Sequence, residues 1–318
     1  MVSIASVRRA SRLVLALGLL LLLASGAAAA VQATDTGLDG RILFVKDGDL
    51  WVVDGSGWRQ LATGGSFSQP SWGPDGTLAY VYRGTNFADI FITDDQGQSQ
   101  FRLTTSQSTV LDNNDWNLRP SWSPDGKLIA FVSDHSTTFP VLWTVDPSDP
   151  STRRPLATPG IQQEMIDAIT WSPDASELAV TVYNDPGPTQ IAVVPVPPRR
   201  ELAHVVTETP GGALDPAWSP DGDWLAFAGR DGYATEIYAM HPDGSGVQKL
   251  TSDGTLSRSP AWSPDGRHVA YVSNHGGNFE IWVLDVNVDA NGNLTPSSPR
   301  QVTRELSVDA ASGLSWGR

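Results

Sequence analysis

The chain has 318 residues, a formal net charge of −14 and no cysteine. A chain this acidic repels phosphate backbones and anionic lipid, so the composition argues against nucleic acid and membrane surfaces as partners. The absence of cysteine excludes disulfide bonds and a lipid tether on an N-terminal cysteine.

The N-terminal segment has the organisation of a secretory signal peptide. Three arginines precede an apolar run at 13–23, and small residues with A-x-A cleavage sites follow it. The alternative is an uncleaved membrane anchor, because the apolar stretch is just long enough to span a bilayer. We therefore expect an exported protein, periplasmic or extracellular. Its expected parts are a signal peptide at 1–30, a short linker at 31–39 and one large domain at 40–318.

A five-residue motif recurs along the rest of the chain. The W-S-P-D-G sequence that begins at Trp122 has near-copies beginning at Trp72, Trp171, Trp218 and Trp262, and Trp316 begins a shortened sixth copy. Successive tryptophans are 50, 49, 47, 44 and 54 residues apart. A period in this range is typical of an array of similar structural units.

Each unit contains four strand-like segments, as the third unit illustrates. A short strand at 119–123 leads into the motif, whose Pro and Gly favour a tight turn. Apolar runs follow at 128–132 and 141–145, and a last short strand ends at 156–158. Because each segment occurs six times, we predict an all-β fold, a six-bladed β-propeller with four antiparallel strands per blade.

The two ends of the repeat array are complementary. The first strand-like segment, at 42–45, corresponds to the second strand of a blade, whereas Trp316 belongs to a first strand. We therefore predict that the strand from about residue 314 completes the first blade. Such a strand closes the ring and leaves no open sheet edge.

The segments W-S-P-D-G, L-A-Y/F-V, E-I-Y/W and L-T resemble the repeats of TolB-like six-bladed propellers over residues 41–316. The resemblance covers the propeller part only, because TolB proteins carry a separate N-terminal α/β domain and about ten residues separate the predicted signal peptide from the first strand here. TolB itself is a periplasmic partner in an envelope-spanning complex, and the difference in domains argues against an identical role for this chain. Similar repeats precede the hydrolase domain of prolyl-oligopeptidase-like enzymes, but we expect neither a hydrolase segment nor a G-x-S-x-G nucleophile elbow in this chain.

The conspicuous residues of the motif are predicted to be structural. The acidic residues stand in Pro-Asp turns, whose geometry favours Asp, so metal ligation is the weaker alternative. These residues are Asp75, Asp125, Asp174, Asp221 and Asp265. The repeated tryptophans are expected to pack between neighbouring blades. Neither set is taken as a binding site.

Function on a propeller belongs to the loops of one face and to the mouth of the central channel, because packing occupies the strands. The innermost strand begins just before each repeated Trp, so the residue three positions ahead is expected to border the mouth. These residues are Gln69, Arg119, Ala168, Asp215, Ser259 and Gly313. The ring is polar and contains no histidine, which favours binding over catalysis.

The loops that lead to this mouth supply further candidates. The longest contains Asp112, Asp115 and Trp116, which combine carboxylates with an aromatic ring outside the repeat pattern. We predict that these residues and Asp167, in the next loop, contact a partner. The alternative for the long loop is a solvated connection in which Trp116 caps a blade.

Metal sites have little support in the sequence. His135 and His275 occupy equivalent positions in the third and sixth units, but these units face each other across the ring at a distance on the order of 20 Å, too far for one ion. Residues 287–294 resemble the first half of a calcium loop, with Asn287, Asp289 and Asn291 as weak candidate ligands. The alternative is a polar hairpin. We expect no cofactor, with calcium as the one alternative.

The sequence therefore favours a non-enzymatic, extracytoplasmic propeller, expected to be a monomer, that binds a protein or peptide through its channel mouth and the loops between blades. The alternative is a metal-dependent lyase or hydrolase that acts on carbohydrates or lactones in the channel. Such sites gather His, Asp or Glu at the mouth, whereas the predicted ring has one Asp and no His.

Overall fold

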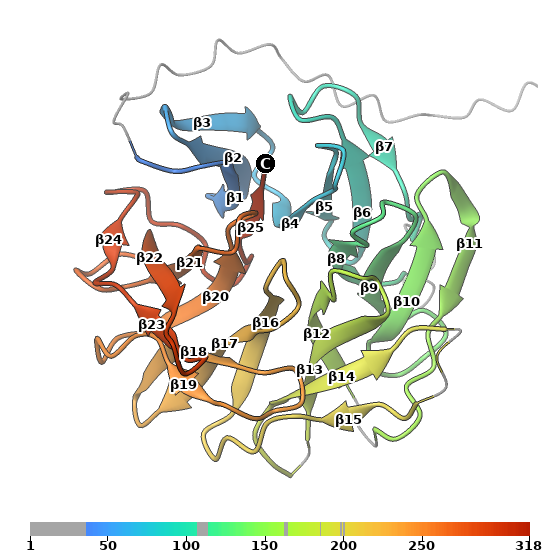
Figure 1. Cartoon of the computed structure of the whole chain (residues 1–318). Coiled ribbons are helices and arrows are strands. Elements are labelled where there is room, and N and C mark those ends of the chain that lie inside the picture. Colours follow the sequence, from blue (N-terminus) through green and yellow to red (C-terminus); the bar gives the residue numbers. More distant parts are fainter. Residues whose placement is uncertain (1–35, 107–113, 162–164, 185, 198, 200) are drawn as a thin grey trace, which may run out of the picture.

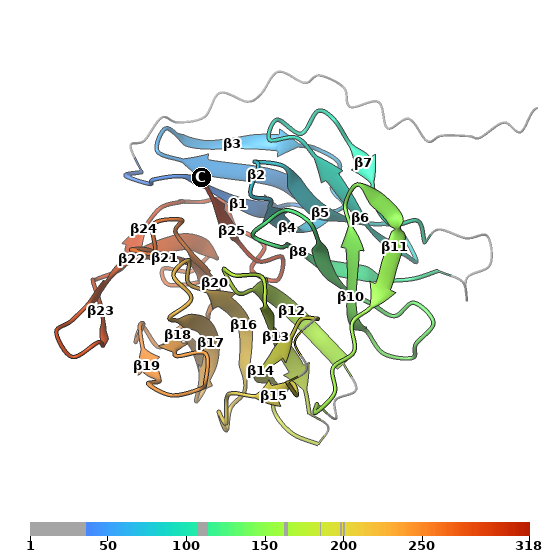
Figure 2. The same cartoon turned by 45° about the vertical axis from the view of Figure 1, so that its right-hand side comes forward.

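A computed structural model describes residues 36–106, 114–161, 165–184, 186–197, 199 and 201–318. Six β-sheets follow one another around a central axis in the order of the sequence (Figures 1 and 2). The predicted signal peptide and the first part of the predicted linker lie outside the described residues. Within the described part of the chain, no helix has the length and apolar character needed to cross a membrane.

The strands of each blade follow one another from the axis outward. Blade 1 contains β25 (Ser315–Gly317), β1 (Arg41–Lys46), β2 (Asp49–Asp54) and β3 (Gly57–Ala62). Blade 2 contains β4 (Phe67–Trp72), β5 (Leu78–Arg83), β6 (Ala88–Thr93) and β7 (Phe101–Arg102). Blade 3 contains β8 (Asn117–Trp122), β9 (Ile129–Ser133), β10 (Val141–Asp146) and β11 (Asp149–Pro155).

The second half of the ring repeats this plan. Blade 4 contains β12 (Met165–Trp171), β13 (Glu177–Tyr183), β14 (Gln190–Pro195) and β15 (His204–Val205). Blade 5 contains β16 (Ala213–Trp218), β17 (Leu225–Asp231), β18 (Ala234–Met240) and β19 (Gln248–Lys249). Blade 6 contains β20 (Ser257–Trp262), β21 (His268–Ser273) and β22 (Glu280–Val288), with β23 (Leu294–Pro296) and β24 (Arg300–Gln301) both paired to β22.

The predicted six-bladed propeller is confirmed, with two differences at the outer edges. Blade 6 has two short outer strands, because β22 is 9 residues long and β23 and β24 pair with different parts of it. In blade 3 the last strand ends at Pro155, one residue before the predicted end at 156–158. A tight turn after Asp146 returns the chain at once, so that Asp146 pairs with Asp149 and β11 covers Asp149–Pro155.

Ring closure is also confirmed. Strand β25 pairs antiparallel with β1, with Trp316 opposite Ile42. The Trp316 indole donates its N–H to the Asp39 carbonyl at 2.9 Å. The backbone of Gly317 lies so close to Trp72 of blade 2 that a Cβ at this position would be 2.7 Å from Cγ of the indole. The closing strand thus binds the first blade by hydrogen bonds and the second by close packing.

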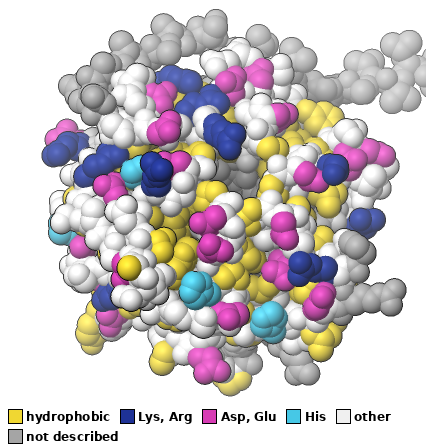
Figure 3. Space-filling model, in the orientation of Figure 1, with side chains coloured by type: hydrophobic (Ala, Val, Ile, Leu, Met, Phe, Trp, Pro, Cys, Tyr) yellow, Lys and Arg dark blue, Asp and Glu magenta, His cyan; other side chains and the backbone are white. Residues whose placement is uncertain are grey.

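The middle strands are buried on both faces because each blade packs against two neighbours. Strand β9 is buried at all five positions, and β14 at all six. One apolar cluster contains Leu142 of blade 3 together with Val180 of blade 4. Viewed along the axis of the ring, hydrophobic side chains surround its centre, with several acidic side chains among them (Figure 3).

The structural role predicted for the Pro-Asp turns is confirmed. The Ser123 hydroxyl donates to Asp125 Oδ1 at 2.8 Å and accepts the Leu128 N–H at 2.9 Å, and the turns that begin at Ser172, Ser219 and Ser263 repeat both bonds. In the turn of blade 2, Gly73 replaces serine and the Thr77 hydroxyl donates to Asp75 instead, at 2.6 Å.

The predicted packing of the repeated tryptophans between blades is confirmed as well. The Trp171 indole of blade 4 donates to the Ser121 carbonyl of blade 3 at 2.9 Å. In the same way, Trp262 of blade 6 donates to the Ala217 carbonyl of blade 5 at 3.1 Å. Each bond joins two neighbouring blades.

Candidate functional site: the channel mouth

The six residues predicted to border the channel share an unusual backbone conformation. Their φ angles are 52° at Gln69, 54° at Arg119, 33° at Ala168, 54° at Asp215, 54° at Ser259 and 80° at Gly313. Non-glycine residues rarely adopt positive φ, and each instance costs on the order of 1–3 kcal/mol. The same strain therefore recurs around the ring, with glycine relieving it in the segment before β25.

A β-bulge accompanies the strain in five of these strands. The pairing register shifts at Ser68/Ser71, Leu118/Ser121, Asp167/Ile169, Leu214/Ala217 and Arg258/Ala261. A bulge leaves one residue out of the ladder and re-aims its side chain, and bulges are common beside functional sites. In this ring the displaced residues turn toward the axis.

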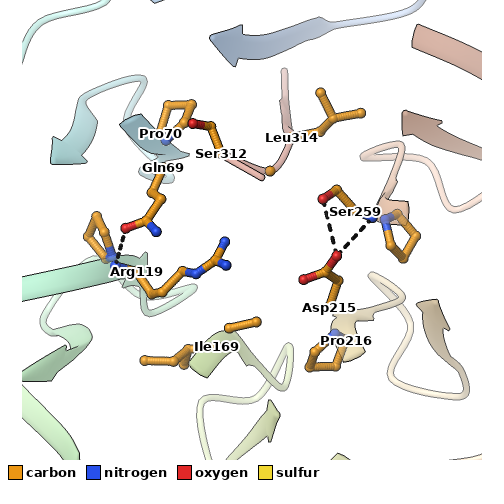
Figure 4. A pocket seen from close by; sticks show the side chains of 13 residues that line it. Gln69, Pro70, Arg119, Ile169, Asp215, Pro216, Ser259, Ser312 and Leu314 are labelled. Atoms are coloured by element: carbon orange, nitrogen blue, oxygen red, sulfur yellow. Dashed lines mark hydrogen bonds between the residues drawn. The ribbon is translucent and has the colours of Figure 1, made fainter. Parts of the chain in front are cut away.

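The six residues line one cavity of about 100 Å³ in the channel (Figure 4). Side chains from five blades and the segment before β25 contribute to its wall, which also includes Pro70, Pro216 and Ser312. The structure thus brings together every residue that the repeat geometry predicted for the mouth. That these residues bind a ligand stays a prediction.

Arg119 forms a bidentate ion pair across two blades. Its Nε donates to Asp167 Oδ1 at 2.6 Å and its Nη2 donates to Asp167 Oδ2 at 3.1 Å. Its Nη1 reaches the Ala311 carbonyl at 3.1 Å, in the segment that leads to the closing strand. The Arg119 side chain is only 14% exposed. The ion pair therefore joins blades 3 and 4, and Arg119 also connects them to the segment before the closing strand β25.

Burial and the ion pair act in opposite directions on both partners. Burial raises the pKa of Asp167. The Arg119 guanidinium lowers this pKa, and the net pKa lies below the ordinary value. Burial lowers the pKa of Arg119, while the Asp167 carboxylate raises it, with a net increase. Both groups are thus charged at neutral pH.

Asp215 belongs to a second ion pair on the opposite wall. Its Oδ2 accepts hydrogen bonds from Arg258 Nε at 3.1 Å, from the Ser259 N–H at 3.2 Å and from the Ser259 hydroxyl at 3.3 Å. The Asp215 side chain is 9% exposed. These bonds tie blade 5 to blade 6.

Gln69 completes the wall beside Arg119. Its Oε1 accepts the Arg119 backbone N–H at 2.9 Å, so that blades 2 and 3 are joined as well. Figure 4 shows the amide nitrogen of Gln69 on the cavity side of this bond. The residue is 7% exposed. Its amide is therefore held in one orientation by a neighbouring blade.

Buried acids that the sequence analysis did not single out hold the loops around this mouth. Glu236 is 1% exposed; it accepts the Thr251 hydroxyl at 2.5 Å and the Gly254 N–H at 2.9 Å. Glu280 accepts the Thr303 hydroxyl at 2.6 Å and the Leu306 N–H at 2.8 Å. The sequence repeat could have indicated these acids. In several units an acidic residue precedes the apolar run of the third strand, and a Thr follows in the L-T segment. These bonds fix the loops from which the next inner strand starts.

The long loop does not bring its described candidates into the channel cavity. Asp115 Oδ2 lies 2.7 Å from His135 Nδ1, and the Trp116 N–H donates to Asp134 Oδ1 at 2.7 Å. Asp112 lies outside the described residues. Asp115 and Trp116 are thus held at blade 3, and their predicted contact with a partner stays a prediction.

The histidine and calcium candidates have local partners. His275 Nδ1 lies 3.9 Å from Asp253, and its ring is perpendicular to Trp282. Asp289 Oδ1 accepts the N–H groups of Asn291 and Asn293 at 2.8 and 2.9 Å, and the Asn287 carbonyl accepts a hydroxyl hydrogen bond. The described residues contain no group of three or more His, Cys, Asp or Glu side chains placed to hold a metal ion. Calcium binding stays a prediction.

One motif was overlooked in the sequence. Gly313-Leu314-Ser315-Trp316-Gly317 has the G-x-S-x-G spacing that we did not expect in this chain. A nucleophile elbow requires a strand-to-helix turn, whereas Ser315 lies within β25 and its hydroxyl accepts the Trp72 N–H at 2.9 Å. The spacing therefore belongs to the closing strand and forms no elbow.

The other end of the channel has a different character. A larger cavity of about 690 Å³ is lined by five tryptophans, four prolines of the turns, and Arg41 and Arg318. The tryptophans are Trp72, Trp122, Trp218, Trp262 and Trp316. We predicted that these tryptophans pack between blades, but not that they also line a cavity.

The fold and the cavity define a six-bladed β-propeller with a polar site in its channel. Residues 161–312 match the TolB beta propeller domain model. The chain is 31% identical over 98 residues to the Tol-Pal system protein TolB of Anaeromyxobacter dehalogenans, which covers 31% of this chain and 22% of that protein. It superposes on the crystal structure of TolB from Acinetobacter baumannii with a TM-score of 0.67, at 21% identity over 89% of this chain and 67% of that one.

Residues 161–312 are thus similar to a TolB propeller domain, and the chain spans about a fifth of the length of the TolB proteins that it matches in sequence. It is also 26% identical over 204 residues to the uncharacterized peptidase YuxL of Bacillus subtilis, which covers 51% of this chain and 29% of that protein.

Proposed function

We propose that this chain is an exported, non-enzymatic scaffold that binds a protein or peptide segment at the channel mouth and the surrounding loops. The observation that carries the proposal is the sixfold positive-φ ring, which strains the backbone around the channel and directs six residues into one cavity. Hydrogen bonds between blades hold the walls in place before any partner arrives. A preorganised site of this kind loses little conformational entropy on binding.

The similarity to a Tol-Pal system protein supports a protein partner outside the cytoplasm. The acidic composition adds a preference for partners that are not themselves strongly acidic. The second candidate function is an enzyme, because the chain is similar to a peptidase over half of its length.

Affinity capture with a cavity-filling variant tests the proposal. Ala168 lines the cavity, so Ala168→Leu fills part of it without removing either ion pair. Ala175 is the matched control, because it is in the same blade and also has positive φ, but lies in the Pro-Asp turn outside this cavity. We expect a partner retained by the wild type and by Ala175→Leu to be lost from Ala168→Leu.

The same capture separates the two functional classes when it is repeated with a chelator. Binding that is unaffected by the chelator supports the scaffold. Chelator-sensitive turnover of an oligosaccharide or lactone panel by the isolated chain would instead establish the metal-dependent enzyme.

A further inference from the structure

The charges around the channel cavity cancel. Figure 4 shows the Arg119 guanidinium and the Asp215 carboxylate pointing toward each other across the cavity. They form no direct ion pair, since Arg119 is paired with Asp167 and Asp215 with Arg258. The two cations and two anions therefore sum to zero. An ion that entered this space would find no uncompensated counter-charge, so the loss of its hydration would not be compensated.

The two walls nevertheless differ in hydrogen-bonding capacity. A guanidinium has five N–H donors, and Arg119 uses three of them on described residues. The amide nitrogen of Gln69 adds two donors on the same wall. Across the cavity, Asp215 accepts the hydrogen bonds of Arg258 and Ser259 through Oδ2, which leaves the lone pairs of Oδ1 for the cavity. One wall thus donates and the other accepts.

We propose that the cavity binds a neutral carboxamide, and that the partner peptide inserts an asparagine or glutamine side chain into the channel mouth. The amide oxygen accepts from Arg119 and Gln69, and the amide NH₂ donates to Asp215 Oδ1. A carboxylate at the same place meets the Asp215 charge, and an ammonium group meets the Arg119 charge. This inference rests on the proposed function, because it names the chemistry of the residue that enters the site.

The size of the cavity agrees with this ligand. Its volume of about 100 Å³ exceeds the roughly 10–15 Å³ that holds a single water molecule on the same measure. That space accommodates the end of one side chain. The rest of the peptide then lies over the loops of the same face.

Three small probes of nearly equal shape test the charge preference. Acetamide, acetate and acetamidinium differ mainly in charge, and each is titrated into the full propeller while the Nε–Hε signal of Arg119 is followed by NMR. We expect saturable binding of acetamide with a Kd at least about tenfold below that of either ion. Equal or tighter binding of acetate or acetamidinium overturns the proposal, and so does the absence of any response to acetamide.

Asp215→Asn converts the acceptor wall into a donor wall. The amide oxygen replaces Oδ2 against Arg258 and Ser259, and the NH₂ group then faces the cavity. We expect this variant to lose acetamide binding at least about tenfold and to gain acetate binding. Glu305→Gln is the control, since it removes an exposed acid from a neighbouring loop outside the cavity, and the probe preference should not change. An Asp215→Asn variant that melts like the wild type and keeps the acetamide preference contradicts the proposal.

Capped tripeptides identify the source of the carboxamide. Ala-Gln-Ala should compete with acetamide, whereas Ala-Glu-Ala should not; competition by N-acetylglucosamine alone overturns the peptide assignment. The outcome is separable from that of the proposed function. Loss of the partner from Ala168→Leu without an acetamide preference overturns this inference and leaves the scaffold standing. An acetamide preference with no partner lost from Ala168→Leu overturns the scaffold.

Discussion

Arg119 and Asp167 join two blades through both oxygens of one carboxylate, at 2.6 and 3.1 Å. The same arginine also bonds the Ala311 carbonyl, which belongs to the last segment of the chain. One side chain therefore connects the middle of the sequence to the closure of the ring.

Removing this guanidinium should destabilise the propeller. We expect Arg119→Met to lower the free energy of unfolding by about 1–3 kcal/mol, because Asp167 then remains partly buried without its cation. Denaturant unfolding of Arg119→Met, Asp167→Asn and the double variant measures the coupling between the two residues. If the two single effects simply add, the ion pair is not coupled and the prediction is wrong.

The closing strand should contribute far more than an ordinary tail. Deletion of residues 312–318 removes β25 and its pairing with Ile42, so we expect a large decrease in the melting temperature or a loss of folding. A chain shortened by Arg318 alone is the control, since it keeps the strand. Melting of the longer deletion within a degree or two of the intact protein would contradict the role of β25 in closure.

The stability that the buried acids Glu236 and Glu280 provide should depend on their hydrogen bonds and not on their charge. Blade 4 carries Gln190 where blade 5 has Glu236, and its Oε1 accepts the Thr207 hydroxyl at 2.6 Å. We therefore expect Glu236→Gln to cost less than about 1 kcal/mol and Glu236→Leu about 2–4 kcal/mol, because the latter leaves a buried hydroxyl and an N–H without an acceptor. Thermal unfolding of the two variants checks this order, and equal losses would refute it.

We expect the propeller to lose stability in acid because of its Pro-Asp turns. Hydrogen bonds from Lys127 and Ser123 lower the pKa of Asp125 from 3.8 to about 2. A carboxyl with a lowered pKa in the folded state stabilises the fold above its ordinary pKa, and this contribution disappears as the pH falls from about 4 to about 2. The pKa values of Asp75 and Asp174 are lowered in the same direction.

Asp125→Asn keeps an acceptor for Ser123 but cannot titrate. The variant should therefore lose less stability than the wild type between pH 5 and pH 2, as measured by urea unfolding. Identical pH profiles for the two proteins would show that this turn does not contribute.

Much of the fold and of the site geometry followed from the repeat. The spacing of the tryptophans predicts the blades, and it also locates Gln69 and Asp215 at the channel, because equivalent positions in a ring face the same axis. The β-bulges and the positive φ angles at these positions were not predictable, because neither Gln nor Asp in the sequence indicates a left-handed backbone conformation.

Contacts between side chains of different blades could not be predicted from the repeat. The pairing of Arg119 with Asp167 depends on how far a long side chain reaches across a blade boundary. Likewise, Asp115 looked available in the sequence, but His135 occupies its carboxylate. A repeat fixes where a residue lies and leaves open which neighbour it contacts.

The pairing of β1 with β25 also constrains when the protein can finish folding. The hydrogen bond from Arg41 to the Arg318 carbonyl links positions 277 apart. Blade 1 cannot acquire its innermost strand until almost the whole chain has been synthesised. During synthesis, the first blade therefore remains incomplete, and the last residues to be added complete the first unit to be made.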